Sequence, residues 1–157
     1  MGNTWEIISP DLSTNDSTKQ QQADSGGLSM DNSGAENHTT IFTIAESPLD
    51  ENVIWVGTDD GNVQVTKDGG KNWQNVVSNI QGLPSNTWTY HIEASVHGKG
   101  IAYAVFDGHN SGDMQPYVYK TSDFGTTWTN IITDNVIGTS RNIQEDYENE
   151  KDRKSVV

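Results

Sequence analysis

The sequence contains no cysteine, which excludes disulfide bonds and thiolate metal sites. Positive charge is also scarce, because 9 lysines and arginines stand against 22 aspartates and glutamates and give a net charge of −13. A surface of this sign repels the phosphate backbone of nucleic acid. We therefore expect no nucleic-acid partner.

Long apolar runs are missing as well. No stretch reaches the roughly 18 apolar residues from which a transmembrane helix is inferred, so no membrane span is expected. The opening residues, "MGNTWEIISPDL", have neither the basic start nor the apolar middle of a signal peptide. This predicts that the chain carries no signal peptide and begins inside a longer protein.

An octapeptide occurs twice in the chain. "TKDGGKNW" (66–73) and "TSDFGTTW" (121–128) share one frame, and their aspartates are 55 residues apart. "GNTW" (2–5) repeats the second half of that frame. Repeats of this length indicate an architecture built from successive similar units.

Around each octapeptide lie short runs rich in Val, Ile, Thr and aromatic residues, bounded by Gly, Asp, Asn or Pro, which is typical of half-buried strands. The expected strands are 40–47, 52–58, 62–66 and 74–80 in the first unit, and 87–95, 101–106, 117–121 and 129–133 in the second. Four strands in a meander form one propeller blade. The sequence therefore predicts an all-β fold, a fragment of a β-propeller with two complete four-stranded antiparallel blades and partial neighbouring blades.

The expected organisation follows from this assignment. It comprises the end of a preceding blade (1–12), a long polar loop (13–39), a first blade (40–80), a second blade (87–133), and the start of a next blade with a truncated tail (134–157).

Each octapeptide is expected to brace the turn between the third and fourth strands. Its aspartate can accept hydrogen bonds from the turn, its glycine permits positive φ, and its tryptophan supplies a large apolar plug. The tryptophans should be buried in equivalent places. The residues assigned this structural role are Thr66, Asp68, Gly70, Trp73, Thr121, Asp123, Gly125 and Trp128.

The octapeptides resemble the Asp-box, or bacterial neuraminidase repeat. The longer phrases "WVGTDDGNVQVTKDGGKNW" and "YVYKTSDFGTTWTNI" resemble a narrower group of secreted bacterial proteins with sortilin-like or xyloglucanase-like propellers, often described as glycosyl hydrolases. The resemblance implies a parent protein with more blades that acts in the extracellular space or periplasm. Asp-boxes specify the fold much more strongly than the function.

Two segments carry the candidate ligand-binding residues. The loop 107–116 is much longer than its counterpart 59–61 in the first unit, and loops of this kind often bind ligands. Alternation in the run 89–95 puts His91 and Glu93 on one face, where they either reach a ligand or form a hydrogen-bonded pair in a wet channel. The candidates are His91, Glu93, Asp107, His109 and Asp113.

Three functions remain open. A carbohydrate- or peptide-binding module needs surface aromatics and hydrogen-bonding groups, which Trp88, Tyr90, His109 and Tyr117 offer. A xyloglucanase-like glycoside hydrolase needs two carboxylates flanking the scissile bond, and these would lie partly or wholly outside this chain. A purely architectural role is the third.

We favour the binding scaffold, because no catalytic, metal or cofactor constellation is visible. Sialidase chemistry is disfavoured because the chain has only two arginines, Arg141 and Arg153.

Overall fold

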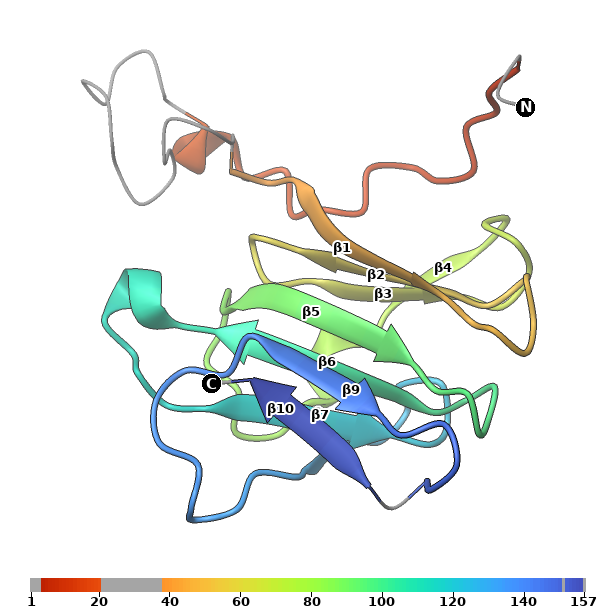
Figure 1. Cartoon of the computed structure of the whole chain (residues 1–157). Coiled ribbons are helices and arrows are strands. Elements are labelled where there is room, and N and C mark those ends of the chain that lie inside the picture. Colours follow the sequence, from red (N-terminus) through yellow and green to blue (C-terminus); the bar gives the residue numbers. More distant parts are fainter. Residues whose placement is uncertain (1–3, 21–37, 151, 157) are drawn as a thin grey trace.

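The computed structural model describes residues 4–20, 38–150 and 152–156. Two four-stranded antiparallel sheets follow one another along the chain, and each is a simple meander (Figure 1). The first holds β1 (Ile41–Glu46), β2 (Ile54–Thr58), β3 (Val63–Thr66) and β4 (Trp73–Asn75). The second holds β5 (Trp88–Ala94), β6 (Ala102–Asp107), β7 (Tyr117–Thr121) and β8 (Thr129–Asn130).

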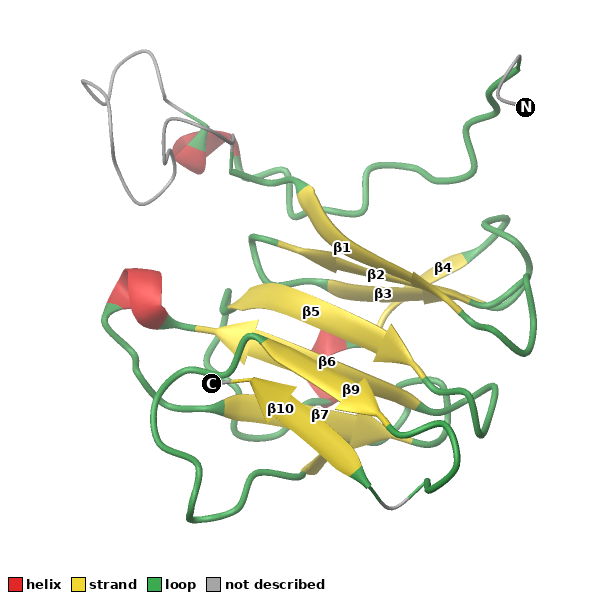
Figure 2. Ribbon diagram, in the orientation of Figure 1, coloured by secondary structure: helices red, strands yellow, loops and turns green. Residues whose placement is uncertain are grey.

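A shorter sheet of two strands follows the second meander. It is formed by β9 (Asn142–Glu145) and β10 (Arg153–Val156), and β9 contacts β5 and β6. The described helices are three 3-10 turns, η1 (Ser17–Lys19), η2 (Val77–Asn79) and η3 (His109–Ser111), coloured red in Figure 2. Within the described residues, therefore, no helix is long and apolar enough to cross a membrane.

This arrangement is that of successive β-propeller blades, and the fold expected from the sequence is confirmed. We call the β1–β4 sheet blade 1, the β5–β8 sheet blade 2, and the β9–β10 sheet the partial blade. The first strands of the three units are neighbours, because β5 contacts both β1 and β9. These first strands are the innermost strands of their blades.

The fourth strands are shorter than expected. In place of a strand over 74–80, β4 ends at Asn75 and η2 follows, while β8 has two residues. The cause is the same in both blades: the side-chain Oδ1 of Asn75 accepts from the amide of Val77 at 3.1 Å, and that of Asn130 accepts from the amide of Ile132 at 2.9 Å. An asparagine side chain that binds the backbone two residues on favours a turn over continued sheet pairing.

The cores lie between blades rather than within them. Trp55 and Val65 of blade 1 pack with Ile92, Ala104 and Phe106 of blade 2, and each of these side chains is almost fully buried. A smaller core joins the other face of blade 2 to the partial blade. Residues buried there are Tyr103, Val105, Val118 and Ile143. Each blade is thus stabilised mainly by its neighbours, as in other repeat architectures.

The far face of blade 1 is partly covered by residues 4–16, which lie along the side of the sheet away from blade 2 (Figure 1). The main-chain carbonyl of Leu12 accepts from Asn62 Nδ2 and Gln64 Nε2, both at 3.0 Å. Asp60 Oδ2 accepts from the amide and hydroxyl of Thr14 at 2.6 and 2.7 Å. Most of the polar loop expected over 13–39 lies outside the described residues.

The octapeptides form the turns between β3 and β4 and between β7 and β8. Asp68 Oδ1 accepts from the Thr66 hydroxyl and the Asn72 amide, both at 2.9 Å. The second copy repeats these bonds with Thr121, Asp123 and Thr127. Gly70 and Gly125 adopt φ values of +92° and +81°, and the hydroxyl of the threonine four residues earlier accepts from each glycine amide.

The two octapeptide tryptophans occupy equivalent places, as expected, but they are only partly buried, which corrects the expectation that they are buried. Trp73 Nε1 donates to the carbonyl of Gly70 and Trp128 Nε1 to that of Gly125, each at 3.1 Å. Trp128 packs edge-on to Trp55 with ring centroids 6.1 Å apart. Each indole nitrogen thus bonds to the glycine of its own octapeptide.

The turn formed by the first octapeptide (66–73) should stabilise the fold less at acid pH than at neutral pH. Hydrogen bonds from the Asn72 side chain and amide and from the Thr66 hydroxyl lower the pKa of Asp68 to about 2. Because this pKa is depressed in the folded state, the stabilisation is present above the unfolded pKa of about 3.9 and is lost as the pH falls toward about 2. In urea unfolding, Asp68→Asn should be less stable than wild type at pH 6, and the gap should narrow between pH 4 and pH 2. A gap that stays constant over this range contradicts the prediction.

Candidate functional site

Phe42, Tyr90 and Arg141 stand at equivalent positions in blade 1, blade 2 and the partial blade, counted from the end of each first hairpin. The pairs Glu46–Ile54, Ala94–Ala102 and Glu145–Arg153 mark the same point of each first hairpin. Four residues before the first member of each pair stand Phe42, Tyr90 and Arg141.

Bulges in β1 and β5 remove Phe42 and Tyr90 from the regular pairing of their strands. The register of β1 shifts between Ile41 and Thr43, and that of β5 shifts between Thr89 and His91. The extra residue at such a bulge leaves the ladder, and its side chain is aimed differently from those of its neighbours. Phe42 and Tyr90 are these extra residues, so neither joins the core between the blades.

The side chains at this position meet one another and the nearby Trp88. Ring centroids are 5.2 Å apart for Phe42 and Tyr90, 4.7 Å for Phe42 and Trp88, and 5.5 Å for Trp88 and Tyr90. The guanidinium carbon of Arg141 lies 5.4 Å from the centre of the Tyr90 ring. We call Phe42, Trp88, Tyr90 and Arg141 the rim cluster. All three rings are partly exposed.

Asp107 holds the arginine in place. Its carboxylate is fully buried at the end of β6, and Oδ2 accepts from Arg141 Nε at 3.1 Å. Oδ1 accepts from the His109 amide at 2.9 Å, and His109 Nδ1 lies 2.8 Å from Oδ2 without hydrogen-bond alignment. About half of the Arg141 side chain is exposed, so a ligand can reach the guanidinium.

The rest of the long loop is closed upon itself. Asp113 Oδ1 accepts from the Gln115 amide at 3.0 Å, and Oδ2 accepts from the Tyr117 hydroxyl at 2.7 Å. Burial and this bond to a carboxylate raise the pKa of Tyr117 to about 12. Gly112 ends η3 in the left-handed conformation, with φ +80°. The loop is therefore a structured turn, and it projects between β6 and β7 at the left of Figure 1.

The other two candidate residues lie between blade 2 and the partial blade. Glu93 Oε1 accepts from the Glu145 amide at 3.0 Å, and His91 contacts the backbone of Ile143. Burial lowers the pKa of His91, and burial raises that of Glu93 with a smaller effect from the Glu145 carboxylate. The structure thus separates the five candidates into three groups: Asp107 with His109 and Arg141, Asp113 with Tyr117, and His91 with Glu93 against β9.

Sequence reasoning missed Phe42 and Arg141. The sequence does indicate Trp88 and Tyr90 as possible ligand contacts, because a binding module needs surface aromatic residues. The missing signal was positional: aligning the three first strands at Glu46, Ala94 and Glu145 would have put Phe42, Tyr90 and Arg141 in one column.

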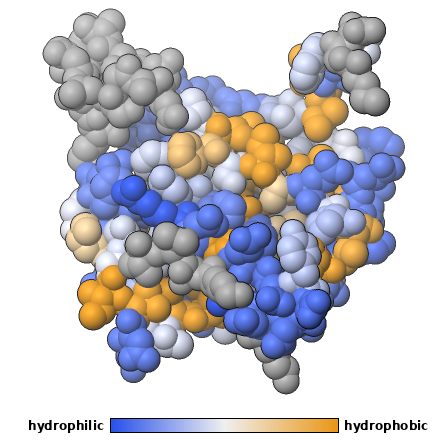
Figure 3. All heavy atoms as spheres, in the orientation of Figure 1, coloured by the Kyte–Doolittle hydropathy of each residue, from blue (hydrophilic) through white to orange (hydrophobic). Residues whose placement is uncertain are grey.

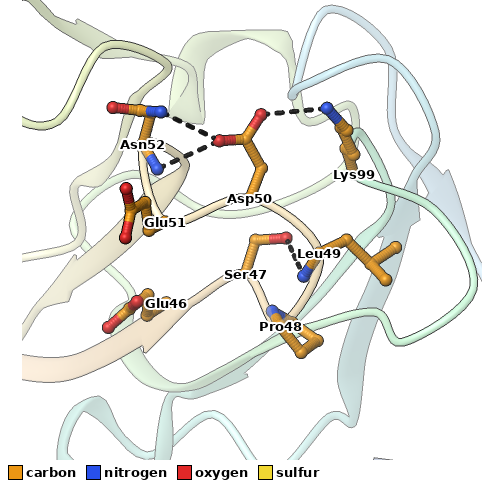
Figure 4. A pocket seen from close by; sticks show the side chains of 8 residues that line it. All are labelled: Glu46, Ser47, Pro48, Leu49, Asp50, Glu51, Asn52 and Lys99. Carbon is orange, nitrogen blue, oxygen red and sulfur yellow. Dashed lines mark hydrogen bonds and ion pairs between the residues drawn. The ribbon is translucent and has the colours of Figure 1, made fainter.

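A hollow of about 490 Å³ lies at the opposite end of the blades, beside the turn between β1 and β2 (Figure 4). Asp50 Oδ2 accepts from Lys99 Nζ at 3.1 Å across it, and Oδ1 accepts from Asn52. The hollow is wide open and mostly polar, and it offers no aromatic ring. Within the described residues, no group of three His, Asp or Glu side chains is placed to hold a metal ion. The rim cluster is the better candidate site.

No protein-family model matches the sequence. An oligoxyloglucan-reducing end-specific xyloglucanase of Emericella nidulans is 30% identical over 91 residues, which are 54% of this chain. The chain spans about a tenth of the length of that relative, since the match covers 10% of it.

Two solved structures are similar in fold. A GH74 enzyme of Niastella koreensis has a TM-score of 0.52 at 12% identity, over 71% of this chain and 18% of that one. YCF48 from Cyanidioschyzon merolae has a TM-score of 0.50 at 20% identity, over 66% and 30% of the two chains. At such identities the likeness concerns the fold, which in each case is a β-propeller.

Proposed function

We propose that these blades form part of the carbohydrate-binding surface of a glycan-active β-propeller, and that the rim cluster binds a neutral β-glucan chain of the xyloglucan type. The rim cluster carries the proposal, and the similarity to a xyloglucanase supports the choice of glycan. Such a polymer lies outside the cytoplasm, so the parent is proposed to be an exported protein.

The chemistry of the cluster suits a sugar ring. Pyranose rings present apolar C–H faces and a rim of hydroxyls, and aromatic side chains offer matching flat surfaces. Phe42, Trp88 and Tyr90 supply such surfaces from two adjacent blades, and Arg141 and His109 supply donors at their edge. The net charge of −13 and the pairing of Arg141 with Asp107 both disfavour an anionic ligand.

The carboxylates at this end of the blades favour binding over catalysis. Glycoside hydrolysis needs a pair of carboxyl groups about 5 to 10 Å apart, of which one acts as acid and the other as base or nucleophile. Asp107 and Asp113 are committed to Arg141 and Tyr117. Asp59 and Asp60 are committed to Thr40 and Thr14 in the same way. If the parent hydrolyses glycans, we place its catalytic pair on other segments.

The test is calorimetric titration of the chain with oligoxyloglucan and with cello-oligosaccharides. Tyr90→Ala removes the ring shared by Phe42, Trp88 and Arg141 and should weaken binding about tenfold, which corresponds to about 1.4 kcal/mol. Tyr147→Ala is the matched control, because Tyr147 is 75% exposed on the turn between β9 and β10. It should bind as wild type does.

Two results would contradict the proposal. One is the absence of binding of either glycan to the folded wild-type chain. The other is equal affinity of wild type, Tyr90→Ala and Arg141→Ala. Binding of a peptide library in place of glycans, with the same sensitivity to Tyr90→Ala, would assign the site to the peptide alternative.

A further inference from the structure

One apolar position in the first strands differs between the blades. Ile44, Ile92 and Ile143 each stand two residues before the point that marks the first hairpin. Ile92 packs against blade 1 and is 2% exposed, and Ile143 packs against blade 2 and is 3% exposed. Ile44 is 65% exposed on the face of β1 away from blade 2. Figure 3 shows apolar atoms gathered over this part of the molecule.

Two residues further along the same face stand Glu46, Ala94 and Glu145. Glu145 is buried and joins the partial blade to blade 2. Its Oε2 accepts from the Ser95 hydroxyl at 2.7 Å and from the Val96 amide at 3.0 Å, and its Oε1 accepts from the Tyr103 hydroxyl at 2.7 Å. Glu46, at the same position in blade 1, is exposed.

The donors that Glu145 meets include a repeated feature of the blades. Ser47 and Ser95 directly follow the first strands of blades 1 and 2, and the hydroxyl of each accepts from the amide two residues on. Blade 2 presents Ala94 to blade 1 at this position. There the buried Nε1 of Trp55, the counterpart of Tyr103, has no hydrogen-bond partner. In blade 2, therefore, the donor in the second strand pairs with a glutamate of the following blade, whereas in blade 1, which faces an alanine, the equivalent donor has no partner.

We propose that Ile44 and Glu46 form a docking face for a further blade of the same fold, which precedes Trp5 in the same polypeptide. Ile44 packs against the apolar face of that blade, as Ile143 packs against blade 2. Glu46 accepts from a serine hydroxyl and the following amide at the end of its first strand, and from a hydroxyl or indole donor in its second strand.

Residues 4–16 already occupy the outer part of this face, which identifies the source of the blade. The carbonyl of Ile8 accepts from Trp73 Nε1 at 3.0 Å, and that of Leu12 binds Asn62 and Gln64. The Gly-x-x-Trp spacing of Gly2 and Trp5 repeats that of Gly125 and Trp128, where a complete blade ends. A second copy of this chain fits less well, because the equivalent donors of its blade 2 are covered by its own β9.

The test adds a blade to the whole chain. A copy of residues 87–124 is joined directly ahead of Gly2, so that the repeated Gly-x-x-Trp completes the copied blade. The copy supplies the donors that Ser95, Val96 and Tyr103 offer to Glu145. Glu46→Gln should lower the Tm of the extended chain by several degrees and leave the Tm of the original chain unchanged. Tyr103→Phe in the copy alone should remove part of this sensitivity.

A thiol probe reports on the face directly, since the chain has no cysteine. Ile44→Cys should react with a maleimide in the original chain and be protected in the extended one. Ile137→Cys is the control, because Ile137 is 85% exposed and should react in both.

Equal reactivity of Ile44→Cys in both chains, or an equal effect of Glu46→Gln in both, overturns the proposal. So does concentration-dependent protection of Ile44→Cys in the original chain, which would make a second copy the occupant. Should the extended chain fail to fold, a copy of residues 40–69 ahead of Gly2 repeats the test with Ser47 and Trp55 as donors, and failure of both extensions also counts against the proposal.

Discussion

Replacing Glu145 by alanine should lower the free energy of unfolding by about 3 kcal/mol, the largest loss that we expect from a single polar side chain. The substitution leaves the buried hydroxyls of Ser95 and Tyr103 and the partly buried amide of Val96 without their acceptor. A buried donor that loses its partner costs about 1 to 3 kcal/mol. The β9–β10 sheet should also exchange its amide hydrogens faster, because β9 would lose its polar connection to blade 2.

Two variants make this result specific. Glu145→Gln keeps one acceptor oxygen and should lose less stability than the alanine variant. Glu148→Ala removes an exposed carboxylate from the same hairpin and should stay within about 0.5 kcal/mol of wild type. If urea unfolding shows equal stability for Glu145→Ala and Glu148→Ala, the interaction between the blades does not depend on this carboxylate.

The fold was predictable because the local signals agree with one another. The octapeptides place a tight turn at the same point of each unit, and the β-branched runs around them have the length of strands. The fourth strands were not predictable from composition, because "QNVVSNI" and "TNIIT" have the residues of strands. What ends each strand is a bond from Asn75 or Asn130 to the backbone, which depends on the turn that follows.

The site was less predictable, for a physical reason. Alternation along 89–95 correctly put His91 and Glu93 on one face, but it does not say which neighbour lies opposite that face. Here the neighbour is β9, so the pair is enclosed between blades. The two bulges also break the alternation, and Phe42 and Tyr90 consequently leave the pattern that a regular strand would impose.

Some of the site rests on contacts between residues far apart in the chain. Arg141 lies in a segment with little pattern, and only the structure shows that Asp107, 34 residues earlier, binds it. The alignment of repeats still indicates its position. The repeats therefore predict the position of a side chain within its blade better than they predict the residue to which it binds.

Replacing Gly57 by alanine should separate the two first strands that support the rim cluster. A Cβ at Gly57 would lie 2.4 Å from Cγ2 of Thr89 and 2.7 Å from Cγ2 of Thr43, much closer than carbon atoms approach in proteins. These threonines also join the blades, because the Thr89 hydroxyl donates to the Asn62 carbonyl at 3.0 Å and the Ile92 amide donates to Thr43 Oγ1 at 3.2 Å. Overpacking of this kind costs about 1 to 3 kcal/mol. Gly57→Ala should also weaken glycan binding, because Phe42 and Tyr90 belong to the strands that are pushed apart.

A double-mutant cycle separates this steric cause from a general loss of stability. Thr89→Ser removes the nearest methyl group and keeps the hydroxyl that binds Asn62, so Gly57→Ala with Thr89→Ser should be more stable than the sum of the two single changes predicts. Gly82→Ala is the control in a connecting turn, where the nearest atom to an added Cβ is the Tyr119 hydroxyl at 3.9 Å. With φ at +81°, it should lose some stability through backbone strain but keep its glycan affinity. Strict additivity of the Gly57 and Thr89 changes in urea unfolding would show that a clash with the Thr89 methyl group is not the cause of the lost stability.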